Sequence, residues 1–558
     1  MQPHCADLSG MTGIDVRPGK GVLTGSSGWH LIQPGLPRDE DHMSWLQDRR
    51  QGLLIGSSIG GAGICLAILA GRKFAVLDSL AGVFARVADL DVQTIPRIVA
   101  VPRTIGILLA ALLLVRLCVN ATPRVRSWTR RAAGIGFASY LVWQLAVLFV
   151  LPPGNADFAV FYRAGQEAAA GRDPYLYAGE DVFLNPLPAL GAFRLASMNP
   201  LAVLGTVWSV VTAVLTCALI PLANRILALG QNDDCGSPAP LTGDVAALLG
   251  AALVNSNASI WGHRLGQLST LTALALLLAV WARQKSRPGL AGVCLALAAI
   301  KPATTLPFLV LFLRKGDRPA WVGMVAVSLG LSLAAAAPSE WPALVRHNIQ
   351  QIKSSAEPGK INDYGFQQEI SSDILAFDHL FYRLGIRDRG LISLVHLAAV
   401  GALLGGLLAL RDRRPFVATA ALVATGAMLV LYHRIYDSVL LALPLACGAS
   451  IALKATGRRR FLAIASVGLL LAVTDQPRSA LSGLTRWSLQ HGLAGWLVQA
   501  VALPYATWSI LLALLLLFFC AFPLRGLRPE LGHLEREEPD PARLSPRPPC
   551  ESPVGLVS

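Results

Sequence analysis

Long apolar stretches fill most of the chain, and polar residues gather between them. Each stretch runs for about 14 to 20 residues with few or no charges, close to the about 20 that a helix needs to cross about 30 Å of hydrocarbon. Candidate spans lie near 52–71, 104–119, 132–152, 201–223, 243–258, 266–282, 288–313, 320–337, 391–410, 416–432, 437–453, 460–474 and 499–522. The pattern predicts an all-α, polytopic membrane protein with roughly 11–13 transmembrane helices.

Positive charge beside the spans predicts which side each connection occupies, because cytoplasmic connections are enriched in Lys and Arg. Five clusters carry this charge: Arg124, Arg126, Arg130 and Arg131; Arg283, Lys285 and Arg287; Arg314, Lys315 and Arg318; Arg411, Arg413 and Arg414; Lys454, Arg458, Arg459 and Arg460. The outer connections are then 153–200, 259–265, the turn around Lys301, 338–390, 433–437 and 475–498. We therefore expect a multi-pass protein of the cell inner membrane whose reactive side chains face the periplasm or exterior.

This orientation requires the segment 288–313 to be a hairpin of two short helices, broken at Ile300-Lys301-Pro302. Each arm of about 13 residues would be about 20 Å long, too short to cross the membrane fully. A broken pair is tolerated at membrane depth where it is buried in protein or lines a cavity. We expect Lys301 at the floor of an outward-facing cavity.

The chain divides by composition into three parts. Residues 1–50 are polar and predict a disordered extension, or Met43 is the true start; 525–558 is Pro-rich, charged and predicted to be disordered. The membrane domain covers 51–524, and two of its outer loops are long. In 157–200 an amphipathic helix is expected from Phe158 to Ala170, and 338–390 is expected to form a small outer subdomain.

Composition and motifs exclude several classes of function. Apolar residues make up 54% of 558 positions and charged residues 15%, and the net charge of +14 lies beside spans, so we expect no nucleic-acid binding. The nine cysteines show no CxxC spacing, which predicts neither a metal site nor a disulfide framework. No Walker loop, GxSxG or HExxH occurs in a strand–helix context. We expect neither a metal nor a cofactor.

Asp157 and Lys301 are the first candidates for chemistry. A carboxylate at the membrane surface can take a proton from a sugar hydroxyl, which makes Asp157 a candidate general base; a helix N-cap is the structural alternative, and the two roles are compatible. No neighbour in sequence neutralises Lys301, and an unpaired charge in an apolar segment costs at least about 2.5–3.5 kcal/mol on insertion scales. We expect Lys301 to hold an anionic phosphate, with snorkelling to the interface as the alternative.

Two further polar groups lie at the outer ends of spans. His433 and Asp437, in Tyr432-His433-Arg434-Ile435-Tyr436-Asp437, would share a helix face and bind substrate together with Arg434. The alternative is a solvated loop with an ordinary ion pair.

His263, Arg264 and Gln267 form the other group, and Gly262 and Gly266 allow close backbone approach there. Substrate binding competes with the ordinary presence of polar residues at helix ends. Tyr162, on the amphipathic helix, is a candidate for contact with a sugar ring.

Three segments of the chain resemble glycosyltransferase family 87. They are DFAVFYRAGQEAAAGRDPYLY (157–177) with FLNPLPAL (183–190), GQLSTLTALALLLAVWARQKSRPGLAGVCLALAAIKPATTLPFLVLFLRK (266–315) and YHRIYDSVLLALP (432–444). Their order and spacing agree over roughly 130–475. The resemblance implies a GT-C fold, a polyprenyl-phosphate sugar donor and Asp157 as catalytic base. It also places Lys301 on a recurrent lysine and His433 in a loop that faces the donor.

Together these expectations describe an inverting transfer of a mannose- or arabinose-like sugar to a hydroxyl of a glycan or glycolipid in the cell envelope. Lys301, helped by Arg264 or Arg434, would hold the phosphate, and these cationic side chains can stabilise it without a divalent metal. A transporter or flippase of a lipid-linked sugar or small anion is the alternative, and a structural subunit is a third. The long outer loop with its carboxylate and the lack of an internal repeat favour the enzyme.

Overall fold

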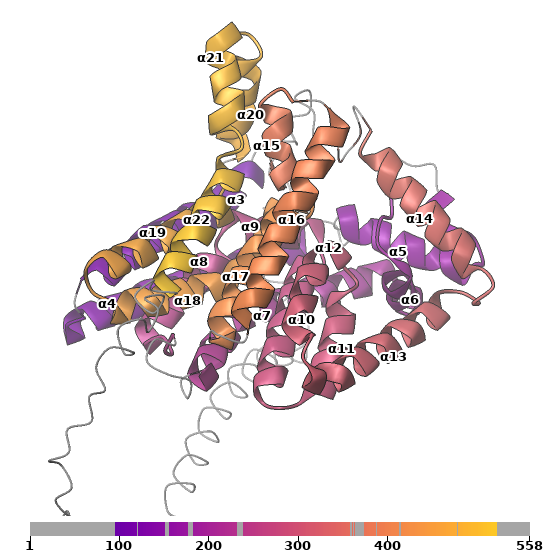
Figure 1. Cartoon of the computed structure of the whole chain (residues 1–558), viewed down its shortest axis with the longest axis horizontal. Coiled ribbons are helices and arrows are strands. Elements are labelled where there is room, and N and C mark those ends of the chain that lie inside the picture. The colour runs from indigo at the N-terminus through magenta and orange to yellow at the C-terminus, as the bar shows by residue number, and fades with distance from the viewer. Residues whose placement is uncertain are drawn as a thin grey trace, which may run out of the picture. The chain divides into compact units, whose positions relative to one another are not determined.

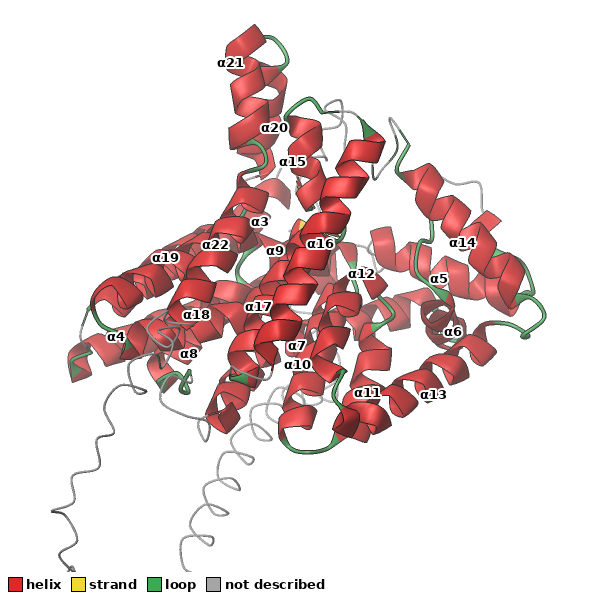
Figure 2. Cartoon of the chain, viewed as in Figure 1, coloured by secondary structure: helices red, strands yellow, loops and turns green. Residues whose placement is uncertain are grey.

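Apolar helices make up nearly all of the described part of the chain, as the hydrophobic pattern predicted (Figures 1 and 2). The computed structural model describes residues 95–119, 121–150, 156–176, 182–230, 238–357, 360, 362, 373–386, 388–411, 415–476 and 478–521, all in one compact unit. The predicted N-terminal extension, the span near 52–71 and the C-terminal tail lie outside these residues. The all-α, polytopic architecture is confirmed.

The N-terminal half of the described chain consists of helices joined by short turns. Its elements are α3 (Ile95–Cys118), α4 (Pro123–Val150), α5 (Ala156–Ala169), η1 (Pro174–Leu176), α6 (Leu187–Ala196), α7 (Leu201–Leu229), α8 (Gly243–Val254), α9 (Asn257–Leu265) and α10 (Ser269–Gln284). The broken segment follows as α11 (Pro288–Ala298), α12 (Pro302–Thr305) and η3 (Leu306–Phe312). The predicted break at Lys301 is therefore confirmed, and so is the amphipathic helix after Asp157.

The remaining elements include the one β pairing among the described residues. They are η4 (Lys315–Asp317), α13 (Arg318–Ala335), α14 (Trp341–Ser355), β1 (Ile374–Leu375), α15 (Phe377–Arg383), α16 (Arg389–Arg411), α17 (Phe416–Val430), β2 (His433–Arg434), η6 (Ile435–Leu441), α18 (Ala442–Lys454), α19 (Gly457–Thr474), α20 (Arg478–Ser488), α21 (Gly492–Leu497), η7 (Val498–Ala502) and α22 (Tyr505–Ala521). Strands β1 and β2 are antiparallel, with Ile374 opposite Arg434 and Leu375 opposite His433.

Fewer helices than expected are long and apolar enough to cross a membrane by themselves. Among the described residues five qualify, or seven if two bent pairs each count as one span. Several predicted spans are shorter helices, such as α10 and α17, and others carry arginines in their first turns, such as α4 and α19. The shortness of these helices accounts for part of the difference from the predicted 11–13 spans, and the predicted span near 52–71 lies outside the described residues.

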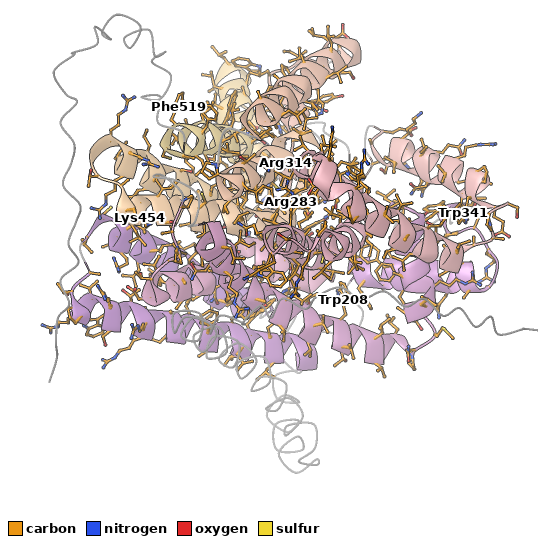
Figure 3. All side chains as sticks on the ribbon, turned by 60° about the horizontal axis from the view of Figure 1, so that its bottom comes forward. Trp208, Arg283, Arg314, Trp341, Lys454 and Phe519 are labelled. Atoms are coloured by element: carbon orange, nitrogen blue, oxygen red, sulfur yellow. The ribbon has the colours of Figure 1, made fainter. Side chains whose placement is uncertain are left out.

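One end of the bundle is held together by buried ion pairs. Arg116 at the end of α3 donates to Asp244 at the start of α8 over 2.9 Å, and both side chains are buried. Arg283 at the end of α10 donates to Asp317 over 2.9 Å, and the backbone N–H of Arg314 donates to the same carboxylate. Figure 3 labels Arg283 and Arg314. Three of the five basic clusters adjoin these contacts, so this is the end of the bundle for which the charge pattern predicts a cytoplasmic position.

Two apolar clusters account for most of the packing. The larger cluster contains side chains from α3, α8, α10, α11, α17, α18, α19 and α22. The smaller holds the outer helices α5, α6 and α14 against the ends of α7 and α13 through Phe158, Phe193, Leu268 and Ile300. Since Leu268 and Ile300 belong to this smaller cluster, the outer loop is packed directly against the segments that carry the candidate polar residues.

The contact between α11 and α13 depends on a glycine. A Cβ added at Gly292 would lie 2.1 Å from the carbonyl oxygen of Ala320, whereas one added at Gly289, on the same helix, would meet nothing within 4 Å. We expect Gly292→Ala to lower the thermal unfolding midpoint in detergent, because the two backbones must separate. Gly289→Ala is the matched control and should be neutral or stabilising by up to about 1 kcal/mol. Equal midpoints for the two variants would contradict this packing.

Candidate active site

Asp157 lies in the first turn of α5, one residue inside the helix. This position places Asp157 at the helix N-terminus, whose partial positive charge attracts carboxylate groups. The next residue, Phe158, is buried and stacks on Trp208 of α7 with ring centroids 5.4 Å apart. Trp208 in turn donates through Nε1 to the Gly266 carbonyl over 3.1 Å. These contacts hold Asp157 against the turn between α9 and α10.

The α9–α10 turn directs Gln267 back toward Asp157. Gly266 ends α9 with φ of 68°, a left-handed conformation that favours glycine, and the backbone N–H of Gln267 returns to the Gly262 carbonyl over 2.8 Å. The Gln267 side chain then donates through Nε2 to Asp157 Oδ2. The structure thus brings together two of the predicted site residues, which are 110 positions apart.

Lys301 occupies the break between α11 and α12. Its backbone is extended, with φ of −118° and ψ of 84°, because the following Pro302 disfavours helical geometry at this position. The ammonium donates to Ser269 Oγ over 3.0 Å and to Asp437 Oδ1, and it lies 4.9 Å from the centre of the Tyr436 ring. Lys301 is therefore neutralised by a carboxylate that is distant in sequence.

Asp437 is the centre of this polar group. Its Oδ1 accepts hydrogen bonds from Ser269 and Lys301, and its Oδ2 accepts the backbone N–H of Arg434 over 3.1 Å. The ring of His433 approaches Oδ2 at 3.3 Å. The side chain is only 3% exposed, so its charge depends on these donors instead of water.

His433 and Asp437 make the predicted contact by a different geometry from the one expected. His433 lies in β2 and Asp437 in the 3-10 helix η6, so the pair results from a helix cap and not from one helical face. The other ring nitrogen, Nε2, faces the Ala427 carbonyl at 3.1 Å. Both ring nitrogens thus lie near acceptor oxygens of the protein.

Arg434 belongs to a neighbouring group. Its guanidinium donates to the Tyr432 hydroxyl over 2.7 Å and to Asn362 Oδ1 over 3.1 Å, and the same Asn362 oxygen accepts the Tyr432 hydroxyl over 2.8 Å. This arrangement ties the segment before η6 to the outer loop between α14 and β1.

His263 points toward α4 and α7. Its ring is buried, with Nδ1 near the Tyr140 hydroxyl at 2.8 Å and near the Gln144 amide, and with Nε2 at 2.8 Å from Thr216 Oγ1. Thr216 donates its own proton to the Thr212 carbonyl, so it accepts from Nε2–H and the ring is the neutral tautomer. These hydrogen bonds join helices, and the structure does not bring His263 into the Asp437 group.

Three other candidate residues have partners of their own. Arg264 lies over the Trp261 ring at 4.7 Å. Tyr162 donates through its hydroxyl to the Asn199 carbonyl over 2.9 Å, at the connection between α6 and α7. Tyr175 is buried and donates to the Asn185 carbonyl over 2.8 Å. Burial, together with the nearby Asp173 carboxylate, raises the pKa of Tyr175, so that it remains a hydrogen-bond donor.

The sequence reading did not include Ser269 among the site residues, although this hydroxyl joins Lys301 to Asp437. Its place two residues after Gln267, at the first position of α10, is the only signal of its role. Among the described residues no three His, Cys, Asp or Glu side chains are arranged to hold a metal ion. The cationic chemistry that the described group offers comes from Lys301.

Comparison with known proteins gives one match. Residues 183–432 match the model of glycosyltransferase family 87. No curated protein and no solved structure matches the chain.

The matched segment is narrower than the roughly 130–475 expected, but it contains Gln267, Ser269 and Lys301. It begins after Asp157 and ends one residue before His433. The resemblance noted in the sequence is confirmed over residues 183–432, and this match to glycosyltransferase family 87 indicates a membrane glycosyltransferase.

Proposed function

We propose that the protein transfers a mannose- or arabinose-like sugar from a polyprenyl-phosphate donor to a hydroxyl of a glycan or glycolipid at the outer face of the cell inner membrane. One observation carries the proposal: the Asp157 carboxylate and the Lys301 ammonium both contact the short segment Gln267–Ser269. A proton acceptor and an anion-binding group thus contact residues that are two positions apart in the chain. A glycosyl transfer from a lipid phosphate needs this combination.

In the proposed reaction Asp157 accepts the proton of the acceptor hydroxyl as its oxygen attacks the anomeric carbon. The glycosidic bond forms while the bond from that carbon to the phosphate oxygen breaks, and the polyprenyl phosphate leaves with the bonding electrons. Attack from the face opposite the phosphate inverts the configuration. Lys301 stabilises the phosphate as its negative charge increases, an effect that is strong where water is excluded. Gln267 orients the carboxylate by its amide hydrogen bond.

Asp437 acts on the phosphate through Lys301. Since both of its oxygens already accept hydrogen bonds from Ser269, Lys301 and the Arg434 backbone, we assign it a positioning role in place of the substrate contact expected earlier. Lys301 remains the donor of this group that is proposed to face the lipid phosphate, and His433, which is buried with both ring nitrogens near protein acceptors, is assigned a positioning role in place of the substrate contact expected earlier. Arg434 holds the outer loop by its contacts with Tyr432 and Asn362.

The two ends of α10 support the proposed outward orientation of the site. This helix starts at Ser269 in the candidate site and ends beside the buried Arg283–Asp317 pair. Its 16 residues rise about 24 Å, so the site lies near the membrane surface opposite the basic clusters.

The purified protein in detergent should convert a radiolabelled polyprenyl-phosphate sugar into a glycosylated acceptor and release the lipid phosphate. A panel of donors that differ in the sugar, offered with extracted envelope glycolipids, identifies the substrate. Detergent solution has no second compartment, so a transporter would give no product there. Absence of product with every donor, from protein shown to be folded, would contradict the proposal.

Asp157→Asn should lower kcat by about 10²-fold or more, because the amide cannot accept the proton. The thermal unfolding midpoint should remain near that of the unsubstituted protein. The matched control is Glu167→Gln on the same helix, whose carboxylate pairs with the exposed Arg172. Both variants are assayed with the same donor and acceptor. Turnover by Asp157→Asn equal to that of the control would refute the base assignment.

Substitutions at the Lys301–Asp437 pair should affect the stability and the activity of the protein differently. Lys301→Met leaves the buried Asp437 charge without its ion partner and should lower the free energy of unfolding by about 3 kcal/mol. The double variant Lys301→Met/Asp437→Asn removes both charges and should recover most of that stability, yet it should remain inactive because the phosphate has lost its ammonium. Unfolding in detergent and sugar transfer are measured on the same preparations. Full activity of the double variant would show that Lys301 serves only the fold.

A further inference from the structure

Around its turn and along α21, the hairpin formed by α20 and α21 buries hydroxyls and exposes leucines, the reverse of a hairpin in water, while α20 also buries Leu481 and exposes Arg486. Thr485 and Ser488 are buried at its centre, at 2% and 3% exposure. Leu489, Leu493 and Leu497 are 55%, 76% and 50% exposed. A hairpin that faced water would bury the leucines and expose the hydroxyls. The outer surface of this hairpin is therefore suited to an apolar environment.

The two helices meet through backbone and small side chains. A Cβ added at Gly495 of α21 would lie 1.9 Å from the Ser488 carbonyl oxygen, so only glycine permits this approach. Gln499 also donates to Ser488 Oγ over 3.2 Å. Close packing over a glycine, supported by polar contacts, is how helices associate in membranes, where burial of apolar side chains gives no driving force.

The position of the hairpin follows from the two helices that support it. α19 and α22 run antiparallel and are joined near both ends, where Arg459 donates to the Cys520 carbonyl over 2.7 Å and Tyr505 to the Ala472 carbonyl over 3.3 Å. From Phe461, just after the basic cluster, α19 rises about 21 Å to Thr474. The hydrocarbon layer is about 30 Å thick, so it extends beyond Thr474 to the base of the hairpin.

The hairpin continues directly into a membrane span. Gly492–Ala502 and Tyr505–Ala521 together pass as one span with a bend of 42°. Figure 1 shows α20 and α21 side by side beyond the ends of α19 and α22. The tip of the hairpin therefore lies at the depth of the outer headgroups.

Its aromatic residues and charge suit that depth. Trp487 and Trp496 are 41% and 42% exposed, and tryptophan is enriched where hydrocarbon meets headgroups. His491 stacks on Trp487 with centroids 4.1 Å apart. From residue 476 to residue 529 the sequence contains no Asp or Glu, so no acidic side chain opposes the lipid phosphates.

We propose that the α20–α21 hairpin is an interfacial anchor that inserts its leucine and tryptophan surface into the outer leaflet, with the lipid surface itself as its partner. This assignment is independent of the proposed sugar transfer. It gives the membrane domain a contact with lipid that lies outside the main bundle of spans.

Fluorescence quenching in lipid vesicles tests the proposal. A thiol-reactive, environment-sensitive probe is attached to Leu493→Cys in the full chain, reconstituted in vesicles of phosphatidylethanolamine and phosphatidylglycerol. Iodide serves as the aqueous quencher, and lipids that carry a nitroxide near the headgroup or deep in the acyl chain serve as membrane quenchers. The unsubstituted protein, labelled in parallel, corrects for native thiols.

Two further positions calibrate the measurement. Ala170→Cys lies in the exposed turn after α5 and represents water, and Val325→Cys, 57% exposed on α13, represents the lipid-facing side of a span. The fluorescence of the probe at position 493 should be quenched by the shallow nitroxide. Iodide should quench it less than the probe at position 170, and the deep nitroxide should quench it less than the probe at position 325.

Two results would overturn the proposal. Iodide quenching at position 493 equal to that at position 170, without nitroxide quenching, would place the hairpin in water. Protection of position 493 from iodide and from the shallow nitroxide in native membranes, combined with full access of iodide in pure lipid vesicles, would identify a protein as the partner.

Discussion

The ion pair between Lys301 and Asp437 is the interaction on which the rest of the candidate site depends. Two charges are taken out of water at the end of a membrane bundle, and such a pair is tolerated only when its remaining hydrogen-bonding positions are filled. Ser269 and the Arg434 backbone fill them. This requirement brings three separate parts of the chain together: the start of α10, the break before α12 and the start of η6. Asp157 then joins them through Gln267, which precedes α10.

The pair also determines the electrostatic state in which the site meets a donor. Because Asp437 already neutralises Lys301, the site presents an ammonium whose charge is shared, and an arriving phosphate competes with a carboxylate for it. The lipid phosphate that leaves after transfer meets the same competition. In the proposed transfer this competition would let the site bind the phosphate and still release the anionic lipid product.

Sequence patterns were sufficient for the helices and for the break at Lys301, because apolar length, basic clusters and Pro302 act locally. They also identified Asp157, Gln267, Lys301, His433 and Asp437, since polar residues between apolar spans stand out. The partners of these residues could not be obtained in this way. That Lys301 pairs with Asp437 over 136 positions, and that His263 joins α4 to α7, are results of packing between distant helices. Ser269 resembles any first residue of a helix until its neighbours in space are known.

The short β pairing has a consequence for how substrate choice can change. Leu375 lies opposite His433, so the long outer segment is joined to the strand beside the candidate site by main-chain hydrogen bonds, which are insensitive to side-chain identity. Residues of that segment can therefore be exchanged while the strand keeps its register. In this fold most side chains of the outer segment are able to change without moving the strand beside the candidate site, the exception being Asn362, which Tyr432 and Arg434 contact.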